Sequence, residues 1–464
     1  MMVGEYINLF ERPVIRFWGR KSPTLCLGLI NKYSSFDDIV LDCFGGSGSI
    51  IQAAILSKRR GIYIDANPYA WFITYVLLEG VSDISKYLEA VSKICNRRRV
   101  YYILNGKKCW ILKEKLYQAR CPICGELEEV KYYKWSKGDC CAILTCGHTI
   151  RSNDFVGTTL ARYLYPRKAP LYYENGTPFD KRRNVNYIHE LFTSRNLLLL
   201  STLLYDIDNI SKQYPSDIAL ALYFTFVAIL FNSSKMARNG AGSWGVPCYW
   251  IPPTHIEKDP YRLFKNKARL LANYFTKLNE LKNELDYKVS TDIKDVLNGK
   301  CELAITIGNT LDLKDIPDES IDLVFTDPPH TDEIQYFELS YFYWSWLISS
   351  RRFNNLIKKI LGFKPKLDFN IEICINLKRN KTLNIYLDEL HKSFNEIYRV
   401  LKENRYAILF FHEEDSRVKA EIIRRMREKF IIKENLKVLM KQRAIGERNP
   451  EGKNLDIFIL LKRE

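Results

Sequence analysis

A strand, a glycine turn, a helix and a second strand follow one another near the start of the chain, and this unit restricts the fold more than any other feature. Residues 37–44, "DDIVLDCF", and 61–68, "GIYIDANP", have the apolar patterns of strands. Between them, "GGSG" precedes an alanine-rich amphipathic pattern, "SIIQAAILSKRR" (49–60), which predicts a helix. A unit of this kind is typical of a parallel sheet, so we predict an α/β fold.

Strands and helices alternate again in the last third of the chain. The patterns predict strands at 302–310, 321–330 and 405–413, helices at 383–404 and 416–430, and a closing pair of strands at 430–441 and 454–464. Between these two ends the chain changes to a cysteine-bearing segment, a connector rich in Tyr, Pro and Arg, and long helical patterns at 197–214 and 259–286. We predict one sheet from residues 1–81 and 301–464, interrupted by an insertion at 82–300.

Charge and apolar runs limit the partners and the compartment. The net charge of +16 favours a polyanion such as nucleic acid, although a solvated basic surface would carry the same charge. The start, "MMVGEYINLF", lacks the pattern of a secretory signal, and we expect a cytoplasmic protein. The apolar run from Ile218 to Phe231 is shorter than the roughly 20 residues of a membrane helix. It predicts a buried helix and no membrane partner.

The glycine turn lies where a parallel sheet binds its ligands. Gly45, Gly46 and Gly48 follow the first strand directly, and glycines there let a backbone approach a ligand closely. Asp65 ends the second strand, 19 residues after Gly46, where an acid can accept hydrogen bonds from the two hydroxyls of a ribose. The pair indicates a nucleoside cofactor. A turn that needs glycine for steric reasons alone is the simpler interpretation.

A second motif, Asp-Pro-Pro, ends another buried strand. Asp327, Pro328 and Pro329 follow "IDLVFT", and the prolines cannot continue a strand ladder. The turn therefore holds a carboxylate at the carboxyl edge of the sheet, where a doubly wound fold binds its ligand. An ordinary proline turn with a solvated acid is the alternative. Together with the glycine turn and Asp65, a ligand site is the better interpretation.

These two motifs carry a resemblance to a known family. "FGGSGS" with a following acid, and then "TDPPH", resemble the amino-methyltransferases that use S-adenosylmethionine to methylate the exocyclic nitrogen of adenine or cytosine in DNA. The resemblance covers residues 17–67 and 302–464. More narrowly, "RFWGRKSP" (16–23), "NSSKMARNGAGSW" (232–244), "QYFELSYFYWSWL" (335–347) and "FFHEED" (410–415) are similar to segments of adenine-specific DNA methylases with a zinc-ribbon insertion. The resemblance implies a Rossmann-like methyltransferase sheet and a helical target-recognition region at about 185–297.

The resemblance also implies roles for single residues. Asp327 and the carbonyl around Pro328 would accept the two N–H groups of an amino group, because this directs the nitrogen lone pair at the methyl group. The base would be flipped out of the duplex and stacked on the residue after the prolines, usually tyrosine. The implied cofactor-binding residues are Asp42, Phe44, Gly45, Gly46, Gly48, Asp65, Asn67 and Asn309, and the implied catalytic residues are Asp327, Pro328, Pro329 and His330.

Two positions depart from the family pattern. His330 stands where tyrosine is usual; it can stack but covers less area, and a surface histidine beside the turn is the alternative. Asn309 stands where the family often has an acid near the adenine of the cofactor, and its carbonyl can still accept from an amino group. We expect weaker pairing there and no loss of the site.

Three functions remain open at this stage. A DNA methyltransferase comes first, with adenine N6 preferred over cytosine N4 because Asp, and not Ser, heads the motif. Methylation of guanine N2 in RNA uses the same turn, but "HTDE" does not fit those enzymes. A non-catalytic DNA-binding subunit is the third.

Methylation at carbon 5 of cytosine would need a nucleophilic cysteine. Cys248 is the candidate, and we interpret it as structural. The expected partner is double-stranded DNA, and a cognate restriction nuclease is a further candidate.

The cysteine segment predicts a structural zinc site within residues 115–150. Cys121 and Cys124 have the Cys-x2-Cys spacing of a zinc knuckle, and "TCGH" supplies Cys146 and His148 as a second pair. Ile143 stands where a tidy ribbon would place a cysteine, so Cys140 or Cys141 could substitute. Free core thiols are the alternative. Basic residues cluster near this segment and the connector, interleaved with Tyr and Trp as in a phosphate-binding face: Arg97, Arg98, Arg99, Lys107, Lys108, Lys131, Lys134, Lys137, Arg162, Arg167, Lys168, Lys181, Arg182 and Arg183. A solvated surface of the insertion is the alternative.

Overall fold

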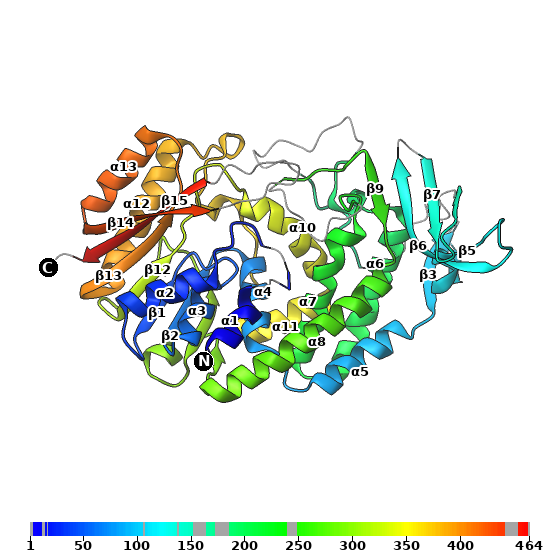
Figure 1. Ribbon diagram of the computed structural model, residues 1–464, viewed down its shortest axis with the longest axis horizontal. Coiled ribbons are helices and arrows are strands. Elements are labelled where there is room, and N and C mark those ends of the chain that lie inside the picture. The colour runs from blue at the N-terminus through cyan, green and yellow to red at the C-terminus, as the bar shows by residue number, and fades with distance from the viewer. Residues whose placement is uncertain are drawn as a thin grey trace.

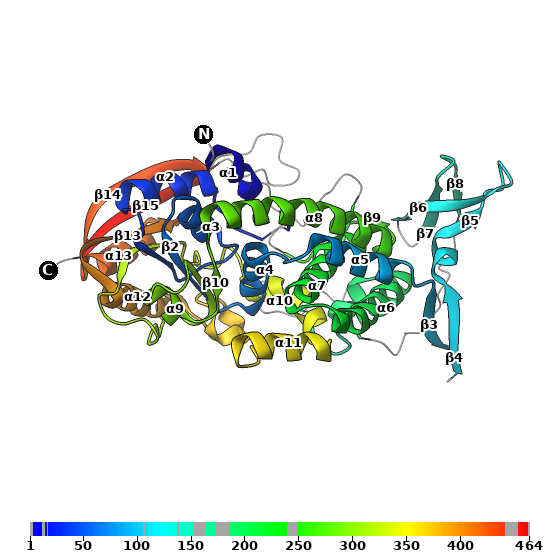
Figure 2. The ribbon, with the colours of Figure 1, turned by 90° about the horizontal axis from the view of Figure 1, so that it is seen from below.

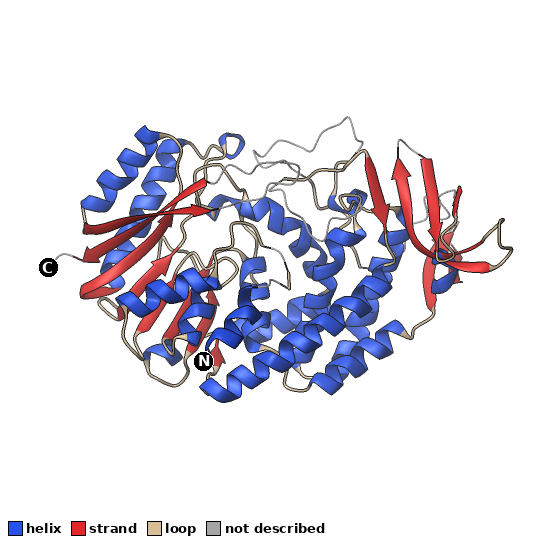
Figure 3. Ribbon diagram, viewed as in Figure 1, coloured by secondary structure: helices blue, strands red, loops and turns tan. Residues whose placement is uncertain are grey.

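A large sheet with covering helices, a central group of helices and a small β region follow one another along the molecule (Figures 1 and 3). The computed structural model describes residues 3–11, 14–15, 17–104, 107–136, 139–151, 164–171, 185–238, 248–440 and 453–462. Both ends of the chain lie at the sheet end of the molecule. The middle of the chain forms the other two parts.

The large sheet has eight strands in the order β10-β11-β2-β1-β12-β13-β15-β14. Neighbouring strands from β10 to β13 are parallel, and β15 runs antiparallel to both its neighbours. A large mixed α/β sheet fits the methyltransferase-like fold that the resemblance implied. The strands are β1 (Ile39–Asp42), β2 (Arg60–Asp65), β10 (Val289–Ser290), β11 (Leu303–Ile307), β12 (Ile321–Thr326), β13 (Leu401–Phe411), β14 (Phe430–Met440) and β15 (Lys453–Lys462).

Helices cover both faces of this sheet, which explains why its central strands β1 and β12 are buried throughout. Every residue of β1 and β12 is buried. Val40 packs with helices α2 (Pro23–Tyr33) and α3 (Ser49–Leu56), whereas Ile39 and Leu41 point to the opposite face. That second face is covered by α9 (Ile293–Leu297), α12 (Leu383–Val400) and α13 (Ser416–Arg427).

The first predicted helix is shorter than its pattern indicated. We predicted it over 49–60, but α3 ends at Leu56 and Arg60 already begins β2. Ser57 closes the helix, because its hydroxyl donates to the carbonyls of Ala53 and Ala54. Lys58 then takes a left-handed conformation with φ of 57°, which a helix cannot continue.

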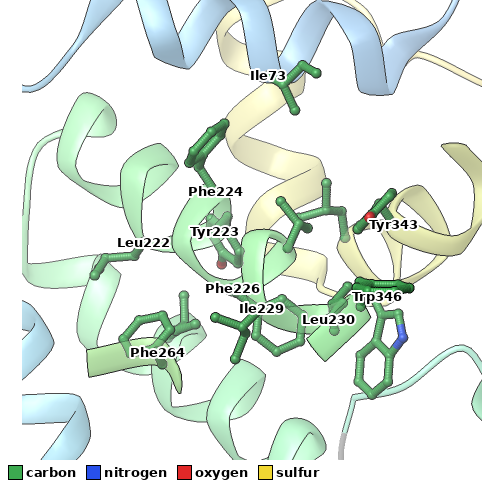
Figure 4. Close-up of a cluster of buried hydrophobic side chains, with 14 of the residues drawn as sticks. Ile73, Leu222, Tyr223, Phe224, Phe226, Ile229, Leu230, Phe264, Tyr343 and Trp346 are labelled. Carbon is green, nitrogen blue, oxygen red and sulfur yellow. The ribbon is translucent and has the colours of Figure 1, made fainter. Parts of the chain in front are cut away.

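The central helices share one hydrophobic core with helices of the sheet part. Figure 4 shows side chains of α7 (Ser216–Leu230) meeting Ile73 of α4 (Pro68–Glu79) and Trp346 of α10 (Tyr336–Ile348). Phe226 and Trp346 are both fully buried, with ring centroids 5.6 Å apart. The same cluster includes α5 (Ile84–Cys95), α6 (Ser194–Ile210), α8 (Pro260–Leu285) and α11 (Arg351–Leu361). The insertion is therefore packed onto the sheet part.

Helix α7 contains the apolar run that we predicted to be a buried helix. Of the described helices, one, over Ser216–Ser233, is long and apolar enough to span a membrane, and 78% of that window is buried inside the protein. A core helix passes the same test of length and composition, so this finding is weak evidence for a membrane span.

The β region combines a hairpin with a second, smaller sheet. The hairpin consists of β3 (Arg99–Leu104) and β4 (Lys107–Leu112), and the sheet of β5 (Gln118–Arg120), β6 (Leu127–Ser136), β7 (Asp139–Leu144) and β8 (Thr149–Arg151). Strand β9 (Thr254–Glu257), from beyond the helices, pairs with β6. Its Glu257 binds the buried Arg195 of α6 at 2.9 Å, and Trp135 of β6 donates to the same carboxylate. These contacts join the small sheet to the helices.

The remaining elements place the boundaries of the insertion. Helix α1 (Val3–Glu11) contacts α2, α3 and α8. Helix α8 runs beside the sheet part, as Figure 2 shows from below. Strand β10 pairs with β11 and α9 packs on the sheet, so the sheet resumes at Val289, before the residue 300 at which we predicted the insertion to end.

Candidate active site

Three acidic residues lie at the point where the strand order of the large sheet reverses. Strand β1 has β2 on one side and β12 on the other, and the carboxyl ends of these strands carry Asp42, Asp65 and Asp327. Open α/β sheets bind their ligands in the crevice at this position. A cavity of about 840 Å³, which includes open space at its mouth, is lined by all three acids.

The glycine turn holds Asp65 in place from both sides of its carboxylate. The N–H of Gly46 donates to Oδ2 and the N–H of Asn67 donates to Oδ1, each at 2.7 Å. Burial nevertheless raises the pKa of Asp65 to about 6, because the two backbone bonds offset only part of the desolvation. The carboxylate also lines the cavity. Its orientation is therefore set before any ligand enters.

Glycine is required in the turn for reasons internal to the chain. A Cβ on Gly45 would collide with the ring of Tyr63, whose hydroxyl donates to the Gly46 carbonyl at 2.8 Å. Gly46 and Gly48 have φ values of +49° and +75°, and a Cβ on Gly48 would lie 2.6 Å from Thr74. The steric interpretation of these glycines thus holds, and Gly45 and Gly46 line the cavity as well.

Asp42 is buried and bound to the end of the neighbouring strand. Thr326 donates its hydroxyl to Asp42 Oδ1 at 2.8 Å, and the Phe44 N–H donates to the Thr326 hydroxyl at 2.9 Å. Burial raises the pKa of Asp42, and the carboxylates of Asp327 and Asp65 raise it further. This network joins the glycine turn to the Asp-Pro-Pro turn.

Asp327 forms the closest ion pair of the cavity. Its Oδ2 lies 2.5 Å from Lys21 Nζ, and its Oδ1 lies 3.5 Å from His330 Nε2. Burial raises the pKa of Asp327, whereas Lys21 lowers it. Pro329 also lines the cavity, and its carbonyl accepts a hydrogen bond from Tyr386 of α12 at 3.0 Å. The turn is therefore anchored from its far side.

His330 lies beside the cavity and does not line it. Its ring meets Phe411 edge-on, with centroids 5.7 Å apart, and lies 6.3 Å from the ring of His412. The side chain is 12% exposed, which excludes the interpretation of a freely solvated surface histidine. Stacking of His330 on a base stays a prediction.

The other predicted cofactor residues lie in or next to the cavity. Phe44, Asn67 and Asn309 line it, whereas Gly48 and Pro328 do not. Asn67 also caps the start of α4, because its side-chain Oδ1 accepts a hydrogen bond from the Tyr69 N–H at 3.0 Å. The side-chain Oδ1 of Asn309 likewise accepts a hydrogen bond from the Leu311 N–H at 3.0 Å. Only the remaining lone pair of this oxygen could accept a hydrogen bond from a ligand.

Several residues that line the cavity had no role in the sequence prediction, and four of them matter for its chemistry. Phe17, Lys21, Tyr336 and Glu372 all line it, and Phe17 stacks on Tyr336 with ring centroids 5.7 Å apart. Burial raises the pKa of Glu372 to about 8. The first three lie within "RFWGRKSP" and "QYFELSYFYWSWL", two of the segments that are similar to adenine-specific DNA methylases. No pattern in the sequence marked Glu372.

The four predicted zinc ligands come together at one end of the small sheet. The ligand atoms of Cys121, Cys124, Cys146 and His148 all lie within 4.8 Å of one another. His148 Nδ1 lies 3.3 Å from Cys121 Sγ and 3.4 Å from Cys146 Sγ. Tetrahedral zinc with its usual bond lengths separates a sulfur and a nitrogen ligand by roughly 3.6 Å. The donor set and its spacing therefore fit zinc, and Cys140 and Cys141 lie on β7, outside this group.

The basic residues of the insertion are only partly described. Lys137, Arg162, Lys181, Arg182 and Arg183 lie outside the described residues, as does the end of the 232–244 segment. Arg97 binds Asp206 at 3.0 Å and Arg98 binds Glu114, so both have intramolecular partners. Both are nevertheless exposed, and the other exposed members of the set are Arg99, Lys107, Lys131, Lys134, Arg167 and Lys168.

A comparison with protein families identifies the amino-terminal part of this site. Residues 16–74 match the model of a family described as DNA methylase. The match supports an N6-adenine and N4-cytosine DNA methyltransferase family for this chain. No curated protein matches it. The methylase segment contains Lys21, the glycine turn and Asp65, and the Asp-Pro-Pro turn joins them in the same cavity from outside the matched residues.

Proposed function

We propose that this methyltransferase transfers a methyl group from S-adenosylmethionine to the exocyclic amino group of a flipped base in double-stranded DNA. Adenine N6 is the preferred target and cytosine N4 the second. One observation carries the proposal: Asp327 of the Asp-Pro-Pro turn and Asp65 beside the glycine turn line the same cavity at the strand-order reversal. The family match supports the DNA substrate in general terms.

The cavity suits a cationic nucleoside ligand. Asp65 offers carboxylate oxygens at the end of β2 to the hydroxyls of a ribose, and Phe17, Phe44 and Tyr336 offer flat apolar surface. Asp42 and Glu372 add buried carboxyl groups to the lining, and an ammonium or a sulfonium group beside them would favour their ionised form. S-Adenosylmethionine supplies an activated methyl group when bound. The residues present therefore fit this cofactor.

The proposed chemistry needs two acceptors and no covalent bond to the enzyme. One amino N–H would donate to Asp327 and the other to a backbone carbonyl near Pro328, which localises the lone pair on the nitrogen. This nitrogen attacks the methyl carbon as the bond between that carbon and sulfur breaks, and the bonding pair stays on sulfur. The methylated nitrogen then loses one proton. Asp327 orients the amino group and is the nearest acceptor for that proton.

We further propose a structural zinc ion in the small sheet, held by Cys121, Cys124, Cys146 and His148. Four protein ligands leave no open position for catalysis, so the metal would stabilise the turns between β5 and β8. Gly125 and Gly147 support such turns, with φ values of +77° and +90°. The exposed basic residues of β6, Lys131 and Lys134, lie in the same sheet and could contact DNA phosphates.

An isotope-transfer assay tests the proposed function directly. The purified protein is incubated with methyl-labelled S-adenosylmethionine and either duplex DNA or transfer RNA, and the nucleosides are separated by mass spectrometry. We expect label in N6-methyladenine from duplex DNA. Label in N4-methylcytosine would change the target base but keep the enzyme class. Label only in N2-methylguanine from RNA, or cofactor binding with no transfer to either substrate, would refute the proposal.

A further inference from the structure

Lys21 donates a hydrogen bond to one carboxylate oxygen of Asp327 and not to the other. Its Nζ lies 2.5 Å from Oδ2 and 3.3 Å from the Gly19 carbonyl, and only 9% of the lysine side chain is exposed. Oδ1 is buried, with His330 Nε2 3.5 Å away, and has no hydrogen-bond partner in the part of the chain that the structure describes. Since Asp327 lines the cavity, Oδ1 is available to a donor that enters it.

The neighbours of Lys21 fix the backbone from which the lysine extends. The Arg20 guanidinium donates to the carbonyls of Phe10 and Glu11, at the end of α1. Ser22 donates to the Glu11 carboxylate at 2.7 Å and also caps α2. With both flanking residues bound, the backbone of Lys21 is held against α1 and α2. The lysine therefore has a defined path to Asp327.

The surroundings of Asp327 are acidic except for Lys21 and His330. The other titratable groups close enough to feel the charge of Asp327 are Cys26 of α2, Asp42 at the end of β1 and Tyr336 of α10, with Asp65 at the end of β2 near them. Burial favours a protonated Asp327 carboxyl group, and the adjacent Lys21 ammonium opposes this. Without Lys21, Asp327 would keep its proton to a higher pH.

We propose that Lys21 is a positioning residue for the methyl transfer. It keeps Asp327 ionised and directs Oδ1 of Asp327 at the amino group of the base. The inference rests on the proposed function. An ionised carboxylate only accepts hydrogen bonds, so Oδ1 can accept from the amino N–H. In a protonated carboxyl group, the O–H could face the amino N–H, and two donors do not form a hydrogen bond. Lys21 acts through Asp327 and stays on Oδ2 throughout.

The pH dependence of methylation separates this role from a merely structural one. In Lys21→Met we expect the acidic limb of the kcat profile to move up by at least about one pH unit, which lowers kcat about tenfold on that limb. At alkaline pH the variant regains activity, because Asp327 then ionises unaided. Lys21→Arg keeps the charge and should keep the limb. The affinity for S-adenosylmethionine should change less than about twofold in either variant.

Two further measurements keep the inference testable. Lys32→Met, on the exposed end of α2, removes the same charge outside the cavity and should leave the profile unchanged. Lys21→Gln replaces Lys21→Met if the latter does not fold. A uniform loss across pH, or an unmoved limb in Lys21→Met, overturns the role of Lys21.

An inactive wild type would instead point to failure of the proposed function, and the inference can then be judged without turnover. The pH dependence of the unfolding free energy, compared with that of Asp327→Asn, reports the pKa of Asp327 directly. We expect this pKa to rise in Lys21→Met. An unchanged pKa overturns the inference even in the absence of activity.

Discussion

Asp65 holds two backbone N–H groups with its two oxygens and still faces the cavity. Asp327 holds Lys21 with one oxygen and has no hydrogen bond on the other among the described residues. These two carboxylates differ in what they can offer a ligand. Both oxygens of Asp65 already accept a hydrogen bond, whereas Asp327 has one oxygen without a hydrogen bond among the described residues, 3.5 Å from His330 Nε2. We therefore expect Asp65 to govern cofactor affinity and Asp327 to govern transfer.

Replacement of Asp327 should separate chemistry from binding. In Asp327→Ala we expect methyl transfer to fall by about 100-fold or more, because positioned acceptors typically contribute that much. The affinity for S-adenosylmethionine, measured by calorimetry, should stay within about twofold. Asp332→Ala, an exposed acid in the same loop, is the matched control and should retain activity. Equal losses of transfer and binding in Asp327→Ala would contradict the role assigned to it.

Cofactor affinity should depend on the ionisation of Asp65, whose pKa is raised to about 6. As the pH falls below 6 the carboxylate gains a proton and loses acceptor capacity, so affinity should drop about tenfold per pH unit. The free protein behaves in the opposite way: a raised pKa in the folded state contributes stability at low pH, which is lost as the pH rises through 6. Calorimetric titrations at several pH values test this. An Asp65→Asn variant whose affinity still varied with pH in the same way would count against it.

At the scale of elements, the small sheet depends on its turns. Strands β5 and β8 have three residues each, and Cys121 and His148 lie in the turns beside them. So few strand residues cannot hold these turns by pairing alone. A metal that binds residues of both turns would hold them together.

Removal of the metal should therefore unfold the small sheet and spare the large one. We expect about one zinc ion per chain, and loss of hydrogen-exchange protection in β5 to β8 after treatment with a chelator. Cys124→Ser should reproduce this, whereas Cys109→Ser on β4, outside the ligand group, should not. A protein that contains no zinc, with protection unaffected by the chelator, would show that these are free thiols.

At the scale of the molecule, the insertion and the sheet part are one packed body. Helices α4 and α10 belong to the sheet part by their place in the chain, yet both contact α7 of the insertion. The aromatic contacts between Phe226, Phe192 and Trp346 cross this boundary. The helical region that the resemblance implies for target recognition is therefore packed against the part of the chain that carries the cavity.

The shared core predicts a single cooperative unfolding transition for these two parts. Phe226→Ala should lower the unfolding free energy by about 3–5 kcal/mol, the usual cost of deleting a fully buried aromatic side chain. The effect should appear equally in circular dichroism and in tryptophan fluorescence during denaturation. Phe36→Ala, at a side chain that is 72% exposed, should change stability by less than about 0.5 kcal/mol. Two separate transitions would show independent domains.

The sequence by itself determined the parts of this protein that depend on local pattern. Buried strands and glycine or proline turns predicted β1, β2 and β12 and the acids that follow them, because turn geometry and apolar runs are local properties. The spacing of Cys121, Cys124, Cys146 and His148 likewise predicted a group that the structure brings together.

Only the tertiary structure decided which side chains meet across long distances. Lys21 and Asp327 are separated by 306 positions, and their contact depends on how α2 packs against β12 and β13. The orientation of His330 toward Phe411, the position of Glu372 in the cavity and the core shared by α7 and α10 have the same origin. Local patterns cannot specify such contacts, since they arise from the packing of whole elements and not from the preference of any one residue.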